Sequence, residues 1–333
     1  MNSNKTAVIC LVFALITGSS FGQIMRKGGE YPLVSPESGH QSNPCVALWG
    51  DGGMVAWENG SANGYKRIAV QSIGANGRTS GGFGIVSQNQ DTVNDVEPSL
   101  HVVNETSAVL VWASGSRANN DIYMLLLGRD GVPMGAVQRV NQTVDRNQCQ
   151  PSVGVSSDGA IMVAWRSDGQ DGDGQGIYGR IYDSSGVPLA EERLINQTTA
   201  GNQAYPEVVG MNDTRFLVVW VRGVVDGKNV SGGLKLRSQV VGRFFKGSSA
   251  QRNEFGISGI EGIVQSPAVL WDQGNKVRVV WMQREVDSRD IFDIWGVGLD
   301  ASSGISEGTP VRINEFTKGE QTNPNIVNHG NQF

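Results

Sequence analysis

Three aspartates in one short glycine-rich loop are the residues whose spacing suggests chemistry most directly. Asp168, Asp171 and Asp173 lie in the segment DGQDGDG. Carboxylates at this spacing can fold around Ca²⁺, which takes about six to eight oxygen ligands in flexible geometry. The loop has no glutamate at the twelfth position of an EF-hand and no flanking helix pattern, and aspartate and glycine are also common turn residues. A calcium loop and a plain turn are both consistent with the residues.

Four acidic residues could supply the two carboxylates that glycoside hydrolysis requires, about 5–10 Å apart. They are Asp95, Glu97, Glu207 and Asp272, near the ends of expected strands. No Asp-box sequence (S-x-D-x-G-x-T-W) accompanies them, and alignment of internal repeats places the first three in ordinary loops. The sequence therefore assigns no catalytic residue.

The three histidines, His40, His101 and His329, are isolated from one another. None belongs to the H-E-x-x-H or H-x-H spacing of a zinc site, so we expect solvated or hydrogen-bonded side chains. The chain also has no G-x-S-x-G elbow, P-loop or dinucleotide fingerprint. We expect no cofactor other than the Ca²⁺ considered above.

The dominant pattern is a repeat in which a proline precedes a tryptophan at nearly constant distance. The two residues are 13 positions apart in the first copy and 14 in the other four, and successive tryptophans are 55, 53, 55 and 61 residues apart. The apolar segments that the tryptophans close are Met54–Trp57, Ala108–Trp112, Ile161–Trp165, Phe216–Trp220 and Val277–Trp281, after Pro44, Pro98, Pro151, Pro206 and Pro267. So long a period indicates a solenoid, a propeller or an array.

The third copy predicts four antiparallel strands. They are Ser152–Val155, Ile161–Trp165, Ile177–Tyr182 and a short strand ending at Leu194–Asn196, joined by turns rich in Ser, Asp and Gly. The second strand is apolar on both faces, which predicts burial between two neighbouring sheets. Four strands in about 55 residues match a propeller blade. We predict an all-β chain, a β-propeller of four-stranded blades, with a β-solenoid as the alternative.

Composition agrees with this fold class. The chain of 333 residues has 45 glycines, where average usage predicts roughly 23, and many tight turns require glycine.

We expect a signal peptide at 1–22 and one repeat domain at 23–333. Its repeats fall at roughly 44–97, 98–150, 151–205, 206–266 and 267–323, with a partial sixth at 324–333. Because the chain opens and closes out of phase with the repeat, we expect an incomplete ring from a longer protein.

The N-terminus predicts export. Lys5 precedes the apolar stretch Ala7–Thr17, and Ser20 and Gly22 occupy the positions before a cleavage point at Gln23. About eleven apolar residues are too few to span a bilayer, so we expect a secreted or cell-surface protein without a membrane span. The formal net charge of −5 and the lack of a basic run argue against nucleic-acid binding.

Cys45 and Cys149 fall in non-adjacent repeats, which favours two buried thiols over a disulfide.

The repeat resembles the tandem Trp-containing repeats of large secreted bacterial surface proteins. The likeness covers Gln23–Phe333 and is strongest at Trp165–Gly172 and Ile177–Asp183, whereas the loops after Trp220 and Trp281 depart from the pattern. The resemblance implies an extracellular propeller-like array beside adhesion or anchoring modules, and it implies no reaction.

Function is therefore expected to be non-enzymatic. We predict an extracellular binding or adhesion scaffold whose partner is a glycan or a cell-surface protein. The alternatives are a polysaccharide-acting, glycosidase-like propeller enzyme and a structural spacer array. Trp49 and Trp271 could form a sugar-stacking platform, whereas Trp295 and Tyr178 share one third-strand position and are expected to serve the core.

Overall fold

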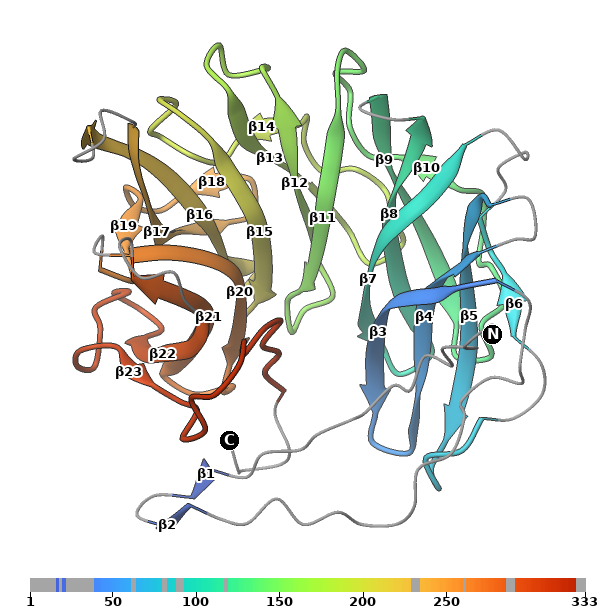
Figure 1. Cartoon of the computed structure of the whole chain (residues 1–333). Coiled ribbons are helices and arrows are strands. Elements are labelled where there is room, and N and C mark those ends of the chain that lie inside the picture. The colour runs from blue at the N-terminus through green and yellow to red at the C-terminus, as the bar shows by residue number, and fades with distance from the viewer. Residues whose placement is uncertain are drawn as a thin grey trace, which may run out of the picture. The chain divides into compact units, whose positions relative to one another are not determined.

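The structure is a computed structural model that describes most of the repeat region. Described residues are 16–17, 20–21, 39–60, 64–79, 83–87, 93–116, 119–228, 234–259, 262–285 and 291–327. None of them is helical (Figure 1). Of the expected signal peptide, only β1 (Ile16–Thr17) and β2 (Ser20–Phe21) are described, as a paired two-strand ladder. His329 and the stretch 328–333 lie outside the described residues.

The chain divides into two compact units. The first unit comprises 1–139 and 327–333, and the second comprises 140–326. Two antiparallel sheets form the first unit. Blade 1 is β3 (Gln41–Trp49), β4 (Gly52–Gly60), β5 (Lys66–Gly74) and β6 (Gly84–Ile85); blade 2 is β7 (Asn94–Asn104), β8 (Ser107–Ser116), β9 (Asn119–Gly128) and β10 (Gln138–Arg139).

Three antiparallel sheets form the second unit. Blade 3 is β11 (Gln148–Val155), β12 (Ile161–Asp168), β13 (Gln175–Tyr182) and β14 (Arg193–Leu194). Blade 4 is β15 (Gln203–Gly210), β16 (Arg215–Lys228), β17 (Leu234–Lys246), β18 (Ser249–Ala250) and β19 (Phe255–Gly256), the last two both pairing with β17. Blade 5 is β20 (Gly262–Trp271), β21 (Lys276–Glu285), β22 (Asp293–Asp300) and β23 (Val311–Arg312).

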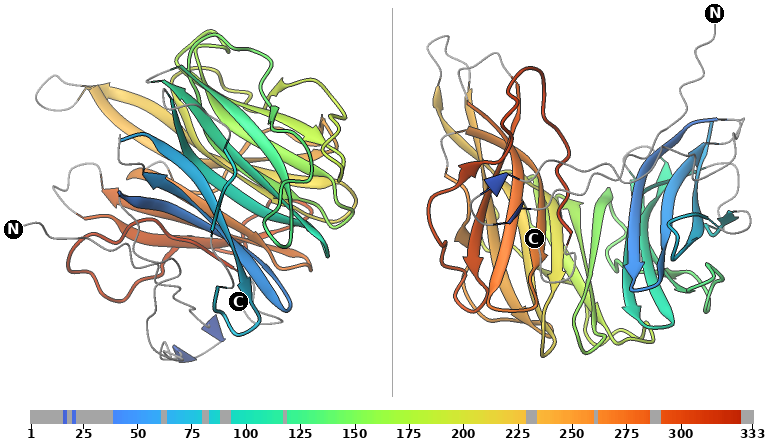
Figure 2. Two further views of the ribbon diagram at one scale, coloured as in Figure 1. Left: turned by 90° about the vertical axis from the view of Figure 1, so that its right-hand side faces the viewer. Right: turned by 90° about the horizontal axis from the view of Figure 1, so that it is seen from below.

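Each blade is an antiparallel meander (Figure 2), with strands paired in chain order apart from β19, which pairs with β17. The prediction of an all-β, β-propeller fold with four-stranded blades is confirmed. In blade 3 the first three observed strands contain the predicted ones, and β11 begins earlier, at Gln148, while β12 ends later, at Asp168. The fourth strand, predicted to end at Asn196, ends at Leu194.

The second strand of a blade supplies two cores at once. On β16, Phe216, Val218 and Trp220 pack into the core shared with blade 3, and the alternate residues Leu217, Val219 and Val221 pack into the core shared with blade 5. Successive side chains on a strand point to opposite faces, so a strand that is apolar at every position needs a neighbour on each side. The predicted burial on both faces is confirmed within this unit.

The first unit is held together in the same way. One core joins Met54 and Ile68 of blade 1 to Leu110 and Trp112 of blade 2. Trp112 is 1% exposed, and Trp165, Trp220 and Trp281 are fully buried. Trp112, Trp220 and Trp281 therefore serve the cores between blades, and Trp57 packs within blade 1.

A β-bulge interrupts the first strand of every blade at its proline. The pairing register shifts between Ser42 and Cys45, Val96 and Ser99, Cys149 and Ser152, Ala204 and Glu207, and Gln265 and Ala268. The residue before each proline has positive φ: Asn43 49°, Glu97 57°, Gln150 52°, Tyr205 54° and Ser266 45°. Proline lacks an N–H for the ladder and bars its predecessor from the right-handed helical region, so the strand bulges there and then resumes.

Candidate functional site

The residue that follows each bulge proline occupies one structural position in all five blades. The occupants are Cys45, Ser99, Ser152, Glu207 and Ala268. Bulges re-aim the side chains beside them and are common next to active sites. Glu207 is the one carboxylic acid of the set, and its side chain is partly buried. The repeat therefore serves as an internal control that singles out blade 4.

The carboxyl group of Glu207 has a distinct environment. Ser152 Oγ on β11 donates a hydrogen bond of 3.0 Å to Glu207 Oε2, and Val208 N donates one of 3.1 Å to Ser152 Oγ. Burial raises the pKa of Glu207 to about 7, and the hydrogen bond from Ser152 opposes that rise. A carboxyl that titrates near neutral pH can both give and accept a proton, as general acid–base catalysis requires.

Close contact between two first strands brings these groups together. Tyr205 N donates a 2.9 Å hydrogen bond to Gln150 Oε1, so the two bulges are joined directly. Further along, a Cβ on Gly154 would lie 2.8 Å from Val208 O, and a Cβ on Gly210 would clash with Val155 O. Any larger residue at either glycine would push β11 and β15 apart and separate Ser152 from Glu207.

The other candidate acids are placed differently. Asp95 is fully buried in β7, and Glu97 is the bulge residue of the same strand. Asp272 accepts hydrogen bonds of 2.9 Å and 3.0 Å from Gly274 N and Lys276 N, which makes it a turn residue. The expectation that Asp95, Glu97 and Glu207 lie in ordinary loops is wrong, because β7 and β15 continue through their prolines and include all three, with Glu97 in the bulge that the pairing skips.

Sequence reasoning missed a buried acid in the first unit. Glu58 is 1% exposed and accepts hydrogen bonds from Ser42, Asn43, Lys66 and the backbone N–H of Glu97. Burial alone would raise the pKa of Glu58, but these bonds hold it below its ordinary value. The group therefore stays ionised and links blade 1 to blade 2. The sequence does contain a sign of this buried acid, because Glu58 directly follows the repeat tryptophan Trp57 at the end of a strand expected to be buried.

The three aspartates of the predicted calcium loop have separate partners. Arg166 Nε lies 3.5 Å from Asp168 Oδ1, Asn196 Nδ2 donates to Asp171 Oδ2 at 3.3 Å, and Gly201 N donates to Asp173 Oδ2 at 3.2 Å. Across the described ranges, no group of three His, Cys, Asp or Glu side chains could hold a metal ion. The calcium loop stays a prediction.

The remaining predicted residues have ordinary surroundings. His101 Nδ1 lies 2.9 Å from Val102 O, and burial lowers the pKa of this histidine. Trp49 Nε1 donates to Asn104 O at 2.9 Å, and Trp271 Nε1 donates to Gly274 O at 2.9 Å. Tyr178 and Trp295 each pair with the tryptophan of their own blade, Trp165 and Trp281, as their shared position predicts. Cys45 and Cys149 are free thiols.

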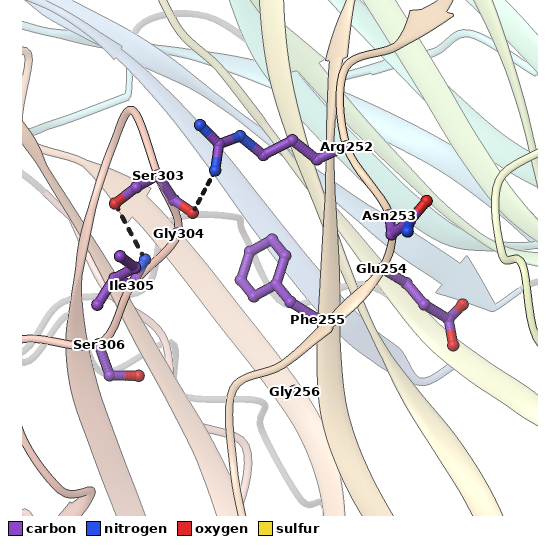
Figure 3. Close-up of a pocket in the computed structure, with 9 residues that line it drawn as sticks. All are labelled: Arg252, Asn253, Glu254, Phe255, Gly256, Ser303, Gly304, Ile305 and Ser306. Carbon is purple, nitrogen blue, oxygen red and sulfur yellow. Dashed lines mark hydrogen bonds between the residues drawn. The ribbon is translucent and has the colours of Figure 1, made fainter.

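A pocket of about 670 Å³ opens between blades 4 and 5 (Figure 3). Its wall on blade 4 runs from Arg252 to Gly256, and its wall on blade 5 runs from Ser303 to Ser306. The Phe255 ring lies between the two walls in the close-up, and Arg252 Nη1 donates to Ser303 O at 3.4 Å.

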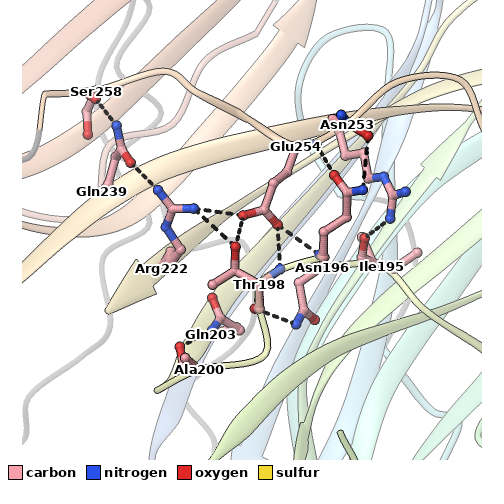
Figure 4. Close-up of polar contacts among 12 residues, drawn as sticks. Ile195, Asn196, Thr198, Ala200, Gln203, Arg222, Gln239, Asn253, Glu254 and Ser258 are labelled. Atoms are coloured by element: carbon pink, nitrogen blue, oxygen red, sulfur yellow. Dashed lines mark hydrogen bonds and ion pairs between the residues drawn. The ribbon is translucent and has the colours of Figure 1, made fainter. Parts of the chain in front are cut away.

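Glu254, at the edge of this pocket, turns away into a network between blades 3 and 4 (Figure 4). Its carboxylate accepts hydrogen bonds from Gln197 N at 2.8 Å and from Thr198 N and Oγ1 at 3.2 Å and 2.5 Å. Arg222 Nη1 lies 2.7 Å from Glu254 Oε1. Glu192 makes the equivalent bonds to Gln142 N, Thr143 N and Thr143 Oγ1. This repeated contact, an interblade clasp, is structural.

Comparison with known proteins gives structural neighbours only. No model of a protein family and no curated protein matches the chain. An α-L-arabinofuranosidase of Fusarium graminearum, solved with arabinobiose, superposes with a TM-score of 0.55 at 11% identity, covering 85% of this chain and 82% of that one. A polysaccharide lyase superposes with a TM-score of 0.51 at 7% identity over 86% and 65% of the two chains.

A xylan β-1,4-xylosidase from Bacillus halodurans reaches a TM-score of 0.46 at 11% identity, over 87% and 58%. This chain thus spans less than two thirds of the xylosidase and of the lyase. The described residues include no helix long and apolar enough to cross a membrane.

These neighbours correct the functional expectation. The arabinofuranosidase and the lyase are enzymes of carbohydrate chemistry, and on this finding the prediction of a non-enzymatic binding or adhesion scaffold is wrong. Identity of 11% or less relates the chains through their fold alone. The Trp-containing repeats of bacterial surface proteins find no match in the comparisons, which show instead a fold shared with a glycoside hydrolase, the arabinofuranosidase.

Proposed function

We propose that this chain acts on an extracellular polysaccharide as a glycosidase-like enzyme, and that Glu207 is its proton-transferring carboxyl. The observation that carries the proposal is the carboxyl itself, which stands at a repeated bulge position where the four other blades have Cys, Ser or Ala. Its raised pKa of about 7 supports the assignment. The carbohydrate enzymes among the structural neighbours support the substrate class.

The chemistry follows from the surroundings of the carboxyl. Near neutral pH a fraction of Glu207 is protonated and able to protonate the oxygen of a glycosidic bond as the bond breaks. The Ser152 hydroxyl, which donates to Oε2, stabilises the carboxylate that remains. Hydrolysis is completed by a water molecule that adds to the anomeric carbon, with a second carboxylate acting as the base or as the nucleophile of a covalent intermediate.

The test is a comparison of the full chain with its Glu207→Gln variant on arabinan, xylan and polygalacturonate. Reducing-end release reports hydrolysis, and ultraviolet absorbance of unsaturated uronate reports elimination. We expect Glu207→Gln to lower the rate about 10²–10⁴-fold, the range typical of one general acid–base group. The matched control is Glu191→Gln on blade 3, whose side chain is 78% exposed, and it should keep the wild-type rate.

Two results would contradict the proposal. One is a Glu207→Gln variant as active as the Glu191→Gln control. The other is a folded wild-type chain that releases no product from any of the three polysaccharides.

Export is part of the proposal, because a polysaccharide of this kind lies outside the cell. It rests on the basic and apolar pattern of the N-terminal residues, with Lys5 before Ala7–Thr17. Mass spectrometry of the protein from culture medium should find Gln23 at the N-terminus. A chain that stays in the cell with its N-terminus intact would argue against export.

A further inference from the structure

The pocket between blades 4 and 5 departs from the repeat at three of its residues. Phe255 pairs with Gly242 on β17, and the equivalent residue of blade 3 is Arg193, which pairs with Gly179 on β13. In blade 5 the same position holds Val311, opposite Gly296. Blade 4 therefore carries an aromatic ring where the other blades of this unit carry an arginine or a valine.

The other two departures bring polar groups to the ring. Arg252 O accepts a bond from Arg243 Nε, just as Ala190 O accepts one from Arg180 Nε, so Arg252 replaces an alanine. Ser306 bridges to Leu299 in blade 5 where Pro188 bridges to Tyr182 in blade 3. Phe255 packs against the core of blades 4 and 5 with part of its ring, whereas Arg252 and Ser306 are exposed. In a repeat protein, departures that meet at one exposed place indicate a functional surface.

The Phe255 ring is partly buried and is held in place by its neighbours. It stacks on the buried Phe244 at 5.6 Å between centroids and 17° between planes, so one face is covered. Gly304, with φ of +69°, gives the ring room, since a Cβ there would lie 2.7 Å from Phe255 Cζ. Phe255 remains partly exposed and lines the pocket (Figure 3). A flat, partly exposed aromatic ring suits the apolar face of a sugar.

The charge at the pocket is positive. Glu254 directs its carboxylate to Thr198, Gln197 and Arg222 and is therefore already compensated. Arg252 is exposed, its guanidinium donates to the neutral carbonyl oxygen of Ser303, and in the described ranges no carboxylate pairs with it. A guanidinium with free N–H groups binds carboxylates in bidentate geometry.

We propose that this pocket binds a uronic-acid unit of an acidic polysaccharide. Phe255 lies against the sugar ring, Arg252 pairs with the uronate carboxylate, and the Ser306 hydroxyl bonds a sugar hydroxyl. The pocket is separate from Glu207 and binding to it needs no catalysis. The binding proposal can therefore be correct or wrong independently of the proposed function.

The experiment measures binding of trigalacturonate and of neutral galactotriose by calorimetry, using the full chain with Glu207→Gln so that neither sugar is consumed. We expect trigalacturonate to bind and galactotriose to bind at least about tenfold more weakly, a difference of about 1.4 kcal/mol. Arg252→Ala and Ser306→Pro restore the residues of blade 3, and Phe255→Leu removes the flat ring while keeping an apolar side chain. Each should weaken trigalacturonate binding about tenfold or more, Arg252→Ala most.

Matched controls are Arg312→Ala and Phe316→Ala on blade 5, which remove an exposed arginine and an exposed phenylalanine away from the pocket. They should leave the affinity for trigalacturonate unchanged. The proposal is overturned by equal affinity for the two sugars, by Arg252→Ala binding as wild type, or by no binding of trigalacturonate at millimolar concentration. Full competition by acetate would also overturn it, since that would show a carboxylate site without sugar recognition.

Discussion

Ser152 and Glu207 are joined across two first strands, since Ser152 Oγ on β11 donates a hydrogen bond of 3.0 Å to Glu207 Oε2 on β15. The serine and the glutamate occupy the same repeat position in successive blades. The Ser152 hydroxyl therefore lowers the pKa of the Glu207 carboxyl.

Ser152→Ala should raise the pKa of Glu207 further. The hydrogen bond from Ser152 favours the carboxylate, so its removal leaves burial less opposed. A carbon-13 NMR titration of the glutamate carboxyls, with Glu207→Gln to assign the signal, measures the change. Ser99→Ala, at the same position of blade 2, is the control. A pKa of Glu207 that falls or stays constant in Ser152→Ala would refute this role.

Glu207 should make the fold less stable as pH rises. Its folded pKa of about 7 exceeds the ordinary 4.5. Between these values the folded state binds more protons than the unfolded state, so the free energy of unfolding falls with increasing pH. Glutamine cannot ionise. We therefore expect Glu207→Gln to gain about 1–3 kcal/mol over wild type between pH 4.5 and pH 7.5.

Urea unfolding at both pH values measures this difference, with Glu191→Gln as the exposed control. A stability difference between Glu207→Gln and wild type that is independent of pH would show that the carboxyl titrates at its ordinary value.

Glu254→Gln should weaken the interblade clasp. Burial opposes ionisation of Glu254, but bonds from Thr198 and Gln197 and the charge of Arg222 hold its pKa below the ordinary value. The variant loses the charge that Arg222 and the two N–H groups require, so we expect about 1–3 kcal/mol less stability at neutral pH.

Because the folded pKa of Glu254 is lowered, its contribution is present above the ordinary pKa of glutamate and is lost as pH falls through the folded value. The deficit of Glu254→Gln should therefore shrink in acid. Calorimetric melting at pH 7 and pH 3 tests this, and an equal deficit at both would contradict the assignment.

Calcium removal should leave the melting temperature unchanged. Asp168 already lies 3.5 Å from Arg166, and Asp171 and Asp173 accept bonds from Asn196 and Gly201. A bound ion at a hundred times its Kd would add about 2.7 kcal/mol, which a thermal melt resolves easily. A melting temperature that drops in EDTA and recovers with Ca²⁺ would establish the calcium loop instead.

The repeat predicted the blades well because its signal is physical and local. A strand apolar at every position, such as Ile161–Trp165, has to be covered on both faces, and a tryptophan every 53 to 61 residues shows how often a blade recurs. The same reasoning failed at Glu207. It started the first strand after the proline, because proline cannot donate to a ladder, and so it left the residues around Pro206 in a loop.

In the structure, a β-bulge lets the ladder continue past the proline. Pairing runs from Gln203 to Ala204, skips Tyr205 and Pro206, and resumes at Glu207. The pocket was missed for a different reason. Arg252 and Phe255 become unusual only after strand pairing equates Phe255 with Arg193, and that register is a long-range property.

The most direct test of the central claim is the pH dependence of turnover by the full chain, beside that of Glu207→Gln. With Glu207 as the general acid, the wild-type rate should be level in mild acid, fall about tenfold per pH unit above about 7, and be lost in the variant across the range. A wild-type rate that stays level or rises through pH 7, with Glu207→Gln retaining it, would contradict the account.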